Sequence, residues 1–557
     1  MRPARTLCLA LISAFSFIQT HCQNSRGQNS TIELKLRSQQ ETAPGAGRFH
    51  RSTRTENWDL KQTAVIVCDV WDSHHCVNAV RRVVEVAPRI DRFVAALRER
   101  GVTVIHAPSG CMDFYHDHPA RQHAIKVPKS SSIPSDIGQW CDQIPAEERA
   151  AYPLDQSKGG EDDDLDEHKL WATRLAAEGR NPGSPWKRQI DVIRIDDQRD
   201  FITDRGDEVW SILDSRSIKN VILTGVHTNM CVLGRPFGLR QMSTHGKNTV
   251  LARDLTDTMY DPTQWPYVSH FTGTDIIVDH IERYVCATIT SDQVLGGRPF
   301  RFSGDTRPRL AILMAEDEYK TEVSLPKFAA EHLGKHFSVN LIFGSESQRN
   351  VVPGIEEIDH ADVLLVSVRR RPLPEDDLRR IRKFVAAGKP VVGIRTASHA
   401  FSLRNQEPAT GLAVWQEFDS QVLGGSYTNH YGNELHPVIS TAEAGSKHPI
   451  MANYQASEFV SSGSLYKVTP LHPGTQVLMT GKIPNELPQP VAWTYVRADG
   501  GRSFYTSLGH IDDFKQPAFR QLLTNALLWT CNLPPVNEQA IRSESDKYAS
   551  GKGKQRK

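Results

Sequence analysis

A buried strand, an amphipathic helix and a second buried strand follow one another early in this chain, and this order constrains the fold more than any other feature. The run 63–69 is short and apolar, 79–100 places apolar residues on one helical face, and 102–106 is apolar again after Gly101. Such a βαβ unit has parallel strands joined by a right-handed crossover. The sequence therefore predicts a parallel sheet covered by helices.

The same alternation continues along the chain and restarts after a stretch rich in glycine, proline and arginine at 298–308. A single core rarely grows beyond about 250–300 residues, so a chain of 557 residues is expected to form two domains. We predict an α/β protein with two doubly wound domains, each a mainly parallel sheet flanked by helices, at 58–297 and 309–533. Further strands are expected at 191–195, 221–225, 248–252, 275–278, 309–314, 338–343, 361–366 and 389–394, with helices at 325–333 and 375–387.

The N-terminus has the composition of a targeting segment. Arg2 and Arg5 precede an apolar run at 7–18, which is too short to span a bilayer and is typical of a secretory signal. We predict a signal peptide at 1–22 and export to the periplasm or the extracellular space. Apart from anchoring by an uncleaved signal, no contact with a membrane is expected.

Two polar stretches flank the expected domains. Residues 23–57 lack a hydrophobic period and are predicted to be a flexible leader, and 534–557 are predicted to be a disordered basic tail. The formal net charge is only +1, which gives no reason to expect nucleic acid as a partner. The nine cysteines include no CxxC pair, so no zinc knuckle or dense disulfide framework is implied.

Two residues with useful chemistry follow strands of the first domain. Asp69 ends the strand at 63–68, and Cys231 follows the strand at 221–225 and a short turn. Ligands of open parallel sheets bind beyond the carboxyl ends of the strands, so both side chains are expected at one edge. A thiolate can act as a nucleophile, a nearby carboxylate can move its proton, and backbone N–H groups of the turn can bind an oxyanion.

The runs Val65-Ile66-Val67-Cys68-Asp69 and Gly225-Val226-His227-Thr228-Asn229-Met230-Cys231-Val232 resemble two motifs of the isochorismatase-like cysteine hydrolases. The resemblance covers about 60–295. It implies that Cys231 attacks an amide or similar carbon, that Asp69 is the acid/base, and that a lysine completes the triad. It also implies a cis peptide near Val226–His227, in a turn whose His227, Thr228 and Asn229 lie beside the oxyanion.

The sequence departs from that family at the lysine. Counting back five residues from Phe201 gives Asp196, so Arg194 or Arg199 is left as a source of positive charge. An arginine can stabilise a thiolate but does not exchange protons readily. A second departure is Arg235-Pro236, since a proline there favours a helix that begins near Arg235 and weakens the helix-dipole argument for Cys231.

Other side chains near these strand ends are candidate substrate contacts: Trp71, Asp72, His74, Tyr115 and Arg235. Aspartates and histidines at 72–76 and 113–118 could also ligate a divalent ion, and some relatives, the nicotinamidases, hold a metal beside the cysteine. Their ligands do not map onto these positions. We assign no metal and no cofactor, and a divalent ion remains an open alternative. The polar stretch 153–187 is expected to be a surface insertion near the mouth of the site.

The second domain carries a different resemblance. Gly501 to His510, followed by an amphipathic helix at 519–529, is similar to a signature of the ThuA-like, trehalose-utilisation family. The resemblance covers about 310–532 and implies a class I glutamine amidotransferase-like fold. Where active amidotransferases carry a cysteine in Gly-x-Cys-x-Gly, this chain has Arg395, so glutaminase chemistry is not expected. His399, His436 and His510 are candidates for a carbohydrate-related pocket.

Three hypotheses about function follow from these patterns. The first is an exported cysteine hydrolase that cleaves a carbon–nitrogen bond of a small molecule, with an accessory ThuA-like domain. The alternative is a protein without catalytic activity that binds a substrate or a carbohydrate through two degenerate enzyme folds. A third hypothesis gives carbohydrate modification to the C-terminal domain. The expected partner is a small molecule, and the oligomeric state stays open.

Overall fold

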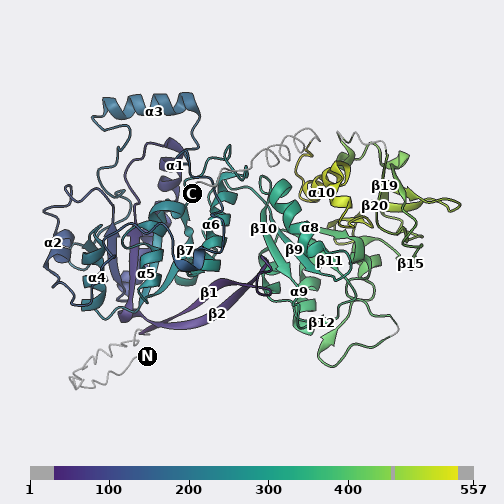
Figure 1. Cartoon of the computed structure of the whole chain (residues 1–557), viewed down its shortest axis with the longest axis horizontal. Helices are drawn as coiled ribbons and strands as arrows, with labels where there is room; N and C mark the ends of the chain where they lie inside the picture. The colour runs from purple at the N-terminus through teal and green to yellow at the C-terminus, as the bar shows by residue number, and fades with distance from the viewer. Residues whose placement is uncertain (1–29, 405, 453, 455–457, 537–557) are drawn as a thin grey trace, which may run out of the picture.

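The computed structural model describes residues 30–404, 406–452, 454 and 458–536. The predicted signal peptide, and the tail from 537 onward, lie outside the described residues. Two large sheets lie side by side, each with helices on both faces (Figure 1). This architecture confirms the predicted α/β class. No helix among the described residues is long and apolar enough to cross a membrane.

The N-terminal sheet has eight strands in the order β2-β1-β8-β7-β6-β3-β4-β5, and the six strands from β3 to β8 pair in parallel. Side chains of β3 alternate between two apolar clusters, Ala64 and Ile66 on one face and Val65 and Val67 on the other, so helices cover both faces. The elements are β3 (Thr63–Cys68), α1 (Val77–Glu99), β4 (Thr103–Ala107), α2 (Pro119–Lys126), α3 (Leu165–Ala177), β5 (Phe201–Ile202), α4 (Gly206–Ser215), β6 (Asn220–Val226), α5 (Leu239–Thr244), β7 (Asn248–Asp257), α6 (His270–Tyr284), β8 (Ala287–Ile289) and α7 (Asp292–Leu295).

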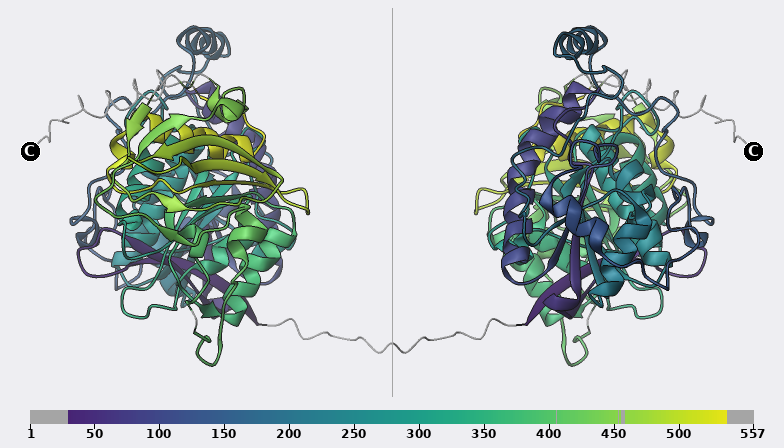
Figure 2. Two further views of the ribbon diagram at one scale, coloured as in Figure 1. Left: turned by 90° about the vertical axis from the view of Figure 1, so that its right-hand side faces the viewer. Right: turned by 90° about the vertical axis from the view of Figure 1, so that its left-hand side faces the viewer.

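The C-terminal sheet has nine strands in the order β10-β9-β11-β13-β21-β20-β19-β16-β17. The first five are parallel and the last four antiparallel, and Figure 2 shows the sheet from its end of the molecule. The elements are β9 (Arg309–Ala315), α8 (Thr321–Phe328), β10 (Ser338–Phe343), β11 (Val363–Val368), β12 (Leu373–Pro374), α9 (Glu375–Ala386), β13 (Val391–Ile394), β14 (Leu412–Ala413), β15 (Asn429–His430), β16 (Val438–Thr441), β17 (Glu458–Val460), β18 (Tyr466–Lys467), β19 (Thr475–Lys482), β20 (Gln489–Val496), β21 (Arg502–Thr506) and α10 (Pro517–Thr530).

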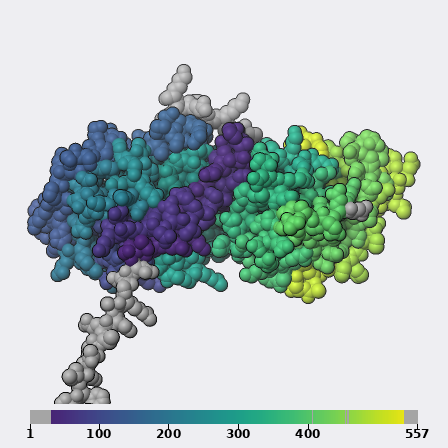
Figure 3. All heavy atoms as spheres, turned by 90° about the horizontal axis from the view of Figure 1, so that it is seen from below, coloured from purple at the N-terminus to yellow at the C-terminus, as the bar shows by residue number. Residues whose placement is uncertain are grey.

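The predicted flexible leader is wrong for residues 31–57. They belong to β1 (Thr31–Glu41) and β2 (Phe49–Asp59), an antiparallel hairpin that pairs with β8 at the edge of the N-terminal sheet. Ile32, Leu34 and Leu36 are buried on one face because apolar and charged residues alternate there with the period of a strand. The hairpin lies across both halves of the molecule (Figure 3), and its Arg37 pairs with Glu282 at 2.8 Å and lies 3.7 Å from Glu357.

Two other expected strands are also wrong. Residues 191–195 form a turn, and the edge strand at this side is the short β5. Residues 275–278 lie inside α6, whose N-terminus is capped by the Ser269 hydroxyl accepting a hydrogen bond from the Thr272 N–H. A run of four apolar and acidic residues is compatible with the hydrophobic period of a strand and with that of a helix. The N-terminal cap favours the helix.

Candidate active site

A close approach of two strands builds the site. Cys68 at the end of β3 is opposite Gly225 near the end of β6. Gly225 has φ 130°, and a Cβ there would lie 2.0 Å from the Cys68 carbonyl oxygen. Only glycine permits this contact, which brings the residues after β3 next to the turn after β6.

Asp69 is the first residue after β3 and is fully buried. Its backbone adopts a left-handed conformation, φ 51°, which is uncommon for a residue with a side chain and is concentrated at functional sites. One carboxylate oxygen accepts a hydrogen bond of 2.8 Å from the Ser109 N–H, and the other accepts 2.8 Å from Arg235 Nε. The carboxylate is therefore held in one orientation by a backbone amide and a cation.

Arg235 supplies the positive charge that the sequence left unassigned. The single helical turn η3 (Thr228–Val232) ends shortly before Arg235-Pro236, and α5 begins only at Leu239. The expected helix start near Arg235 is therefore wrong, since proline interrupts the helical path and the arginine pairs with Asp69 instead. The exposed arginines Arg194 and Arg199 pair with Asp91 and Asp196, so neither of the expected substitutes for lysine reaches Asp69.

Cys231 lies in η3 with only 6% of its surface exposed. Asp69 and Arg235 both lie close enough for their charges to act on its thiol. Burial and the Asp69 carboxylate raise the pKa of the Cys231 thiol well above 9, against the smaller opposing effect of Arg235. The thiol is thus protonated at neutral pH and lies beside a group able to take its proton.

The turn that precedes Cys231 is anchored from both sides. The Thr228 hydroxyl bonds to Thr256 at 2.6 Å, and the Asn229 side chain exchanges two hydrogen bonds with the backbone of Met259. These side chains hold the turn against β7. Because the Thr228 and Asn229 side chains are already bonded within the protein, the groups of the turn expected to bind an oxyanion are its backbone N–H groups. The expected cis peptide near Val226–His227 is wrong: the cis bonds of the described chain lie elsewhere, and His227 turns the backbone through a left-handed conformation, φ 63°.

A stack of rings lies beside the turn. Trp71 stacks on Trp186 with centroids 4.4 Å apart, and His74 stacks on Trp71 at 6.2 Å. His227 is tilted against His74 at 4.7 Å, and burial lowers the pKa of His227 to about 4, so its ring is neutral at pH 7. Trp186 belongs to the insertion at 153–187, so the end of this insertion packs on Trp71 and His74.

Asp72 and Tyr115, two of the expected substrate contacts, already have partners within the protein. Asp72 pairs with Arg180 at 2.9 Å and accepts the N–H of Lys187, so it holds the end of the insertion. The buried Tyr115 hydroxyl accepts the N–H of Gln189 at 3.0 Å. Both residues position the insertion, including Trp186, in this structure.

A cavity of about 510 Å³ lies next to the turn and includes Asn229 and Met230, the two residues before Cys231. Trp140 lines the same cavity, and its ring lies 5.3 Å from the Arg235 guanidinium. Glu147 also lines the cavity, where it forms a buried pair with Arg240 at 2.8 Å and bonds to His280 at 2.7 Å. Sequence patterns did not single out Trp140, Trp186 or Glu147, because each lies in a long loop without a strand or helix signal.

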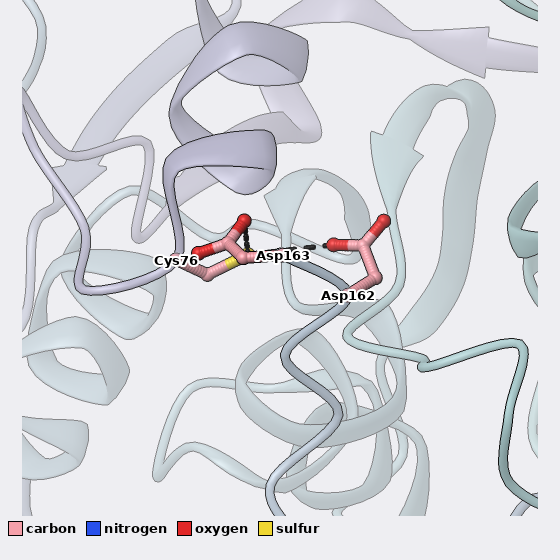
Figure 4. Close-up of side chains that lie close together, drawn as sticks. All are labelled: Cys76, Asp162 and Asp163. Carbon is pink, nitrogen blue, oxygen red and sulfur yellow. Dashed lines mark hydrogen bonds between the residues drawn. The ribbon is translucent and has the colours of Figure 1, made fainter. Parts of the chain in front are cut away.

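The described residues contain one group of metal-ligating types within reach of a single ion, Cys76 with Asp162 and Asp163 (Figure 4). These carboxylates already have donors: Asp163 accepts the N–H groups of Val77 and Asn78 at the start of α1, and Asp162 pairs with Arg82. Burial raises the pKa of Cys76, which keeps its thiol protonated and able to donate to both aspartates. The group is therefore a helix cap, and it does not fit a metal.

The histidines and aspartates at 113–118 do not join the residues at 72–76 in a ligand set. His116 bonds to the adjacent Asp117 at the surface, and His118 caps α2 by accepting the N–H of Ala120. The structure therefore brings together Asp69, Arg235 and Cys231, and it leaves the second group of expected ligands apart from them.

Comparison with known proteins decides the identity of the C-terminal half. Residues 317–530 match the family model "ThuA: Trehalose utilisation". This part of the chain is a ThuA domain. No curated protein matches the chain. Among solved structures, a putative ThuA-like protein from Parabacteroides merdae is 15% identical, with 41% of this chain and 92% of that chain covered and a TM-score of 0.30.

Two further solved structures are similar to the chain at the same low level. A cysteine hydrolase from Pseudomonas syringae pv. phaseolicola is 16% identical, with 43% of this chain and 92% of that chain covered and a TM-score of 0.26. An isochorismatase family protein from Burkholderia thailandensis is 13% identical, with 42% and 93% covered and a TM-score of 0.23. These similarities are too distant to assign an activity, so the case for chemistry depends on the site itself.

In the ThuA domain, Arg395 occupies the turn directly after β13, in a left-handed conformation, φ 46°. The side chain is 1% exposed and donates to the carbonyl oxygens of Ser464 and Ser507. An arginine held in this way, at the position of the nucleophile in active amidotransferases, cannot act as a nucleophile. Of the expected histidines, His399 is buried near Arg395, His510 lies 6.1 Å from the ring of Tyr319, and His436 is exposed.

Proposed function

We propose that the N-terminal part of the chain is a cysteine hydrolase that cleaves a carbon–nitrogen bond of a small amide. The observation that carries the proposal is a buried ion pair, Asp69 with Arg235 at 2.8 Å, close enough to the Cys231 thiol for both charges to act on it. These residues come from segments more than 160 positions apart. A buried pair of charges is expensive unless it is well bonded, and a function is a physical reason to retain it at a thiol.

The proposed reaction begins with a neutral thiol. When substrate displaces water from the site, the Cys231 proton passes to the Asp69 carboxylate and the sulfur attacks the carbonyl carbon. Asp69 then returns the proton to the leaving nitrogen as the carbon–nitrogen bond breaks, which leaves a thioester on Cys231. Water attacks the thioester with its proton taken by Asp69, the acid leaves, and the thiol is re-formed.

Arg235 has a different part in this proposal from that of a lysine. Its guanidinium keeps its charge throughout, so it does not carry a proton. It stabilises negative charge on Asp69 or on Cys231, whichever holds it, and orients the carboxylate through Nε. The cavity beside Asn229 and Met230 is the expected place for the substrate, and Trp140, which lines it, lies 5.3 Å from the Arg235 guanidinium.

The high pKa and the small exposed fraction of Cys231 favour a second candidate, a degenerate site that binds a small molecule without turnover. The two candidates differ in a simple assay. The full chain is incubated with a panel of small primary amides, and ammonia is measured. Hydrolysis predicts release that falls more than about 10³-fold in Cys231→Ala and Asp69→Asn.

Cys286→Ala is the matched control, because Cys286 precedes β8 and so lies at the amino end of the sheet, away from Cys231. Its activity is expected to equal that of the unchanged chain. Release that survives in Cys231→Ala would refute the cysteine mechanism, and binding of an amide without release would favour the second candidate. We include export in the proposal, from the basic and apolar pattern at 1–22.

A further inference from the structure

Four parallel strands of the ThuA domain direct their carboxyl ends to one place. Tyr319 follows β9, Arg370 follows β11, Arg395 follows β13 and His510 follows β21. Their order in the sheet is β9, β11, β13 and β21, so these residues come from adjacent strands. Ligands of open α/β sheets bind outside this edge, where the loops can converge on them.

The charges at this edge are not balanced. Arg369 is paired with Glu318 at 2.6 Å, but Arg370 and Arg404 have no acidic partner in the part of the chain that the structure describes. Burial, and then the charge of Arg404, lower the pKa of Arg370. The Arg370 N–H donates to the His399 carbonyl oxygen at 3.0 Å, which places this arginine beside His399 in a region with an excess of positive charge.

His399 is the side chain most affected by these cations. It is 7% exposed, and burial together with Arg370, Arg369, Arg404 and Arg395 lowers its pKa to about 2. Its Nδ1 lies 3.1 Å from the Ser398 hydroxyl. Within the described residues no hydrogen bond of its other ring nitrogen, Nε2, is seen, and that nitrogen is not among the buried atoms without a partner, so it is open to a ligand.

Aromatic rings hold these groups in place. His399 stacks on Tyr427 with centroids 4.5 Å apart and planes 28° apart, and Tyr427 packs on Tyr466 at 4.7 Å. The Arg395 guanidinium lies between Tyr319 and Tyr466, 4.4 and 4.3 Å from their centroids. The frame is therefore preorganised, and little ordering is required when a ligand binds.

We propose that Arg370, Arg404 and His399, with the ring of Tyr427, form a binding site for a small organic anion, recognised through a carboxylate or phosphate group. Guanidinium groups bind both carboxylates and phosphates through paired hydrogen bonds. An anion would relieve the mutual repulsion of Arg370 and Arg404, whereas a cation would add to it. The unused nitrogen of His399 can accept a hydrogen bond from a hydroxyl of the same ligand. This site is independent of Cys231.

Calorimetric titration of the full chain tests the proposal with three probes that share one ring skeleton: glucose 6-phosphate, glucuronate and neutral glucose. At least one of the two anions is expected to bind, more weakly as salt rises, and glucose is expected not to bind. The preferred anion shows whether phosphate or carboxylate is the natural group. Absence of binding by both anions, or equal binding of glucose, would overturn the proposal.

Substitutions then locate the site. Arg370→Gln keeps a residue with a side chain at the left-handed position, φ 42°, and is expected to weaken anion binding about 10-fold or more. Arg404→Gln, on an exposed loop, is expected to do the same and serves if the first variant does not fold. Arg379→Gln removes a surface arginine of α9 and is the control, with affinity unchanged. Equal affinity in Arg404→Gln and Arg379→Gln would contradict the assignment.

Discussion

Removal of the Arg235 guanidinium should destabilise the N-terminal sheet domain through Asp69. The Asp69 side chain is fully buried, and among the described residues its cationic partner is Arg235, at 2.8 Å. Loss of one member of such a pair leaves an uncompensated buried charge and costs about 3–5 kcal/mol. For a domain of 150–250 residues this corresponds to a fall in Tm of about 6–20 °C. Arg235→Gln is expected to show this fall. Arg235→Lys is expected to show a smaller fall, because lysine keeps the positive charge but lacks the planar arrangement of N–H donors of a guanidinium.

Calorimetry of a double-mutant cycle separates this pair from a general loss of packing. Asp69→Asn removes the charge that Arg235 neutralises, so Asp69→Asn with Arg235→Gln should be much less destabilised than the sum of the two single variants. Arg174→Gln and Arg199→Gln are matched controls, since both replace exposed arginines that pair with glutamates at the surface, and little change is expected. The reasoning is refuted if the two effects add, or if either control equals Arg235→Gln.

Three other expectations follow from the same region. Gly225→Ala should prevent folding or lower Tm steeply, because the added Cβ meets the Cys68 carbonyl oxygen. Gly246→Ala has open space around it and should cost only about 1 kcal/mol. Similar losses of stability in the two variants would contradict the packing argument. Burial opposes ionisation of Glu147, but hydrogen bonds from His280 and Arg240 outweigh burial and lower the pKa of Glu147 to about 2. Acid titration should therefore show that folding stability is lost as the pH falls from 4.5 to 2, and the plot of stability against pH should be flatter in Glu147→Gln. Alkylation of Cys231, followed by peptide mass spectrometry, should be slow at pH 7 and still rising above pH 9, and a plateau below pH 8 would contradict the raised pKa of its thiol.

Alternation of strands and helices was sufficient to predict the parallel part of each sheet, because buried parallel strands are continuous apolar runs. It failed where the signal was shorter or mixed. The hairpin β1–β2 carries charged residues on its exposed face, so its alternation at Ile32, Leu34 and Leu36 resembled a polar leader. The run at 275–278 was too short to tell a strand from a helix, and only the Ser269 cap distinguishes them.

The candidate site was predicted in part. Asp69 and Cys231 could be named because each follows a strand, and strand ends converge at one edge of a parallel sheet. Arg235 could be named only as a substrate contact, since its role depends on how Pro236 interrupts the helical path and on an ion pair across 166 positions. Trp140 and Trp186 could not be named at all, because long loops carry no periodic pattern from which their positions follow.

Capture of the covalent intermediate tests the central claim most directly. The full chain is mixed with the amide that releases ammonia fastest, quenched in acid within the first turnover, and digested for peptide mass spectrometry. The account predicts an acyl group bound as a thioester to Cys231, and none in Cys231→Ala. Ammonia release with no acyl group on Cys231, or with one on another thiol such as Cys111, would contradict it.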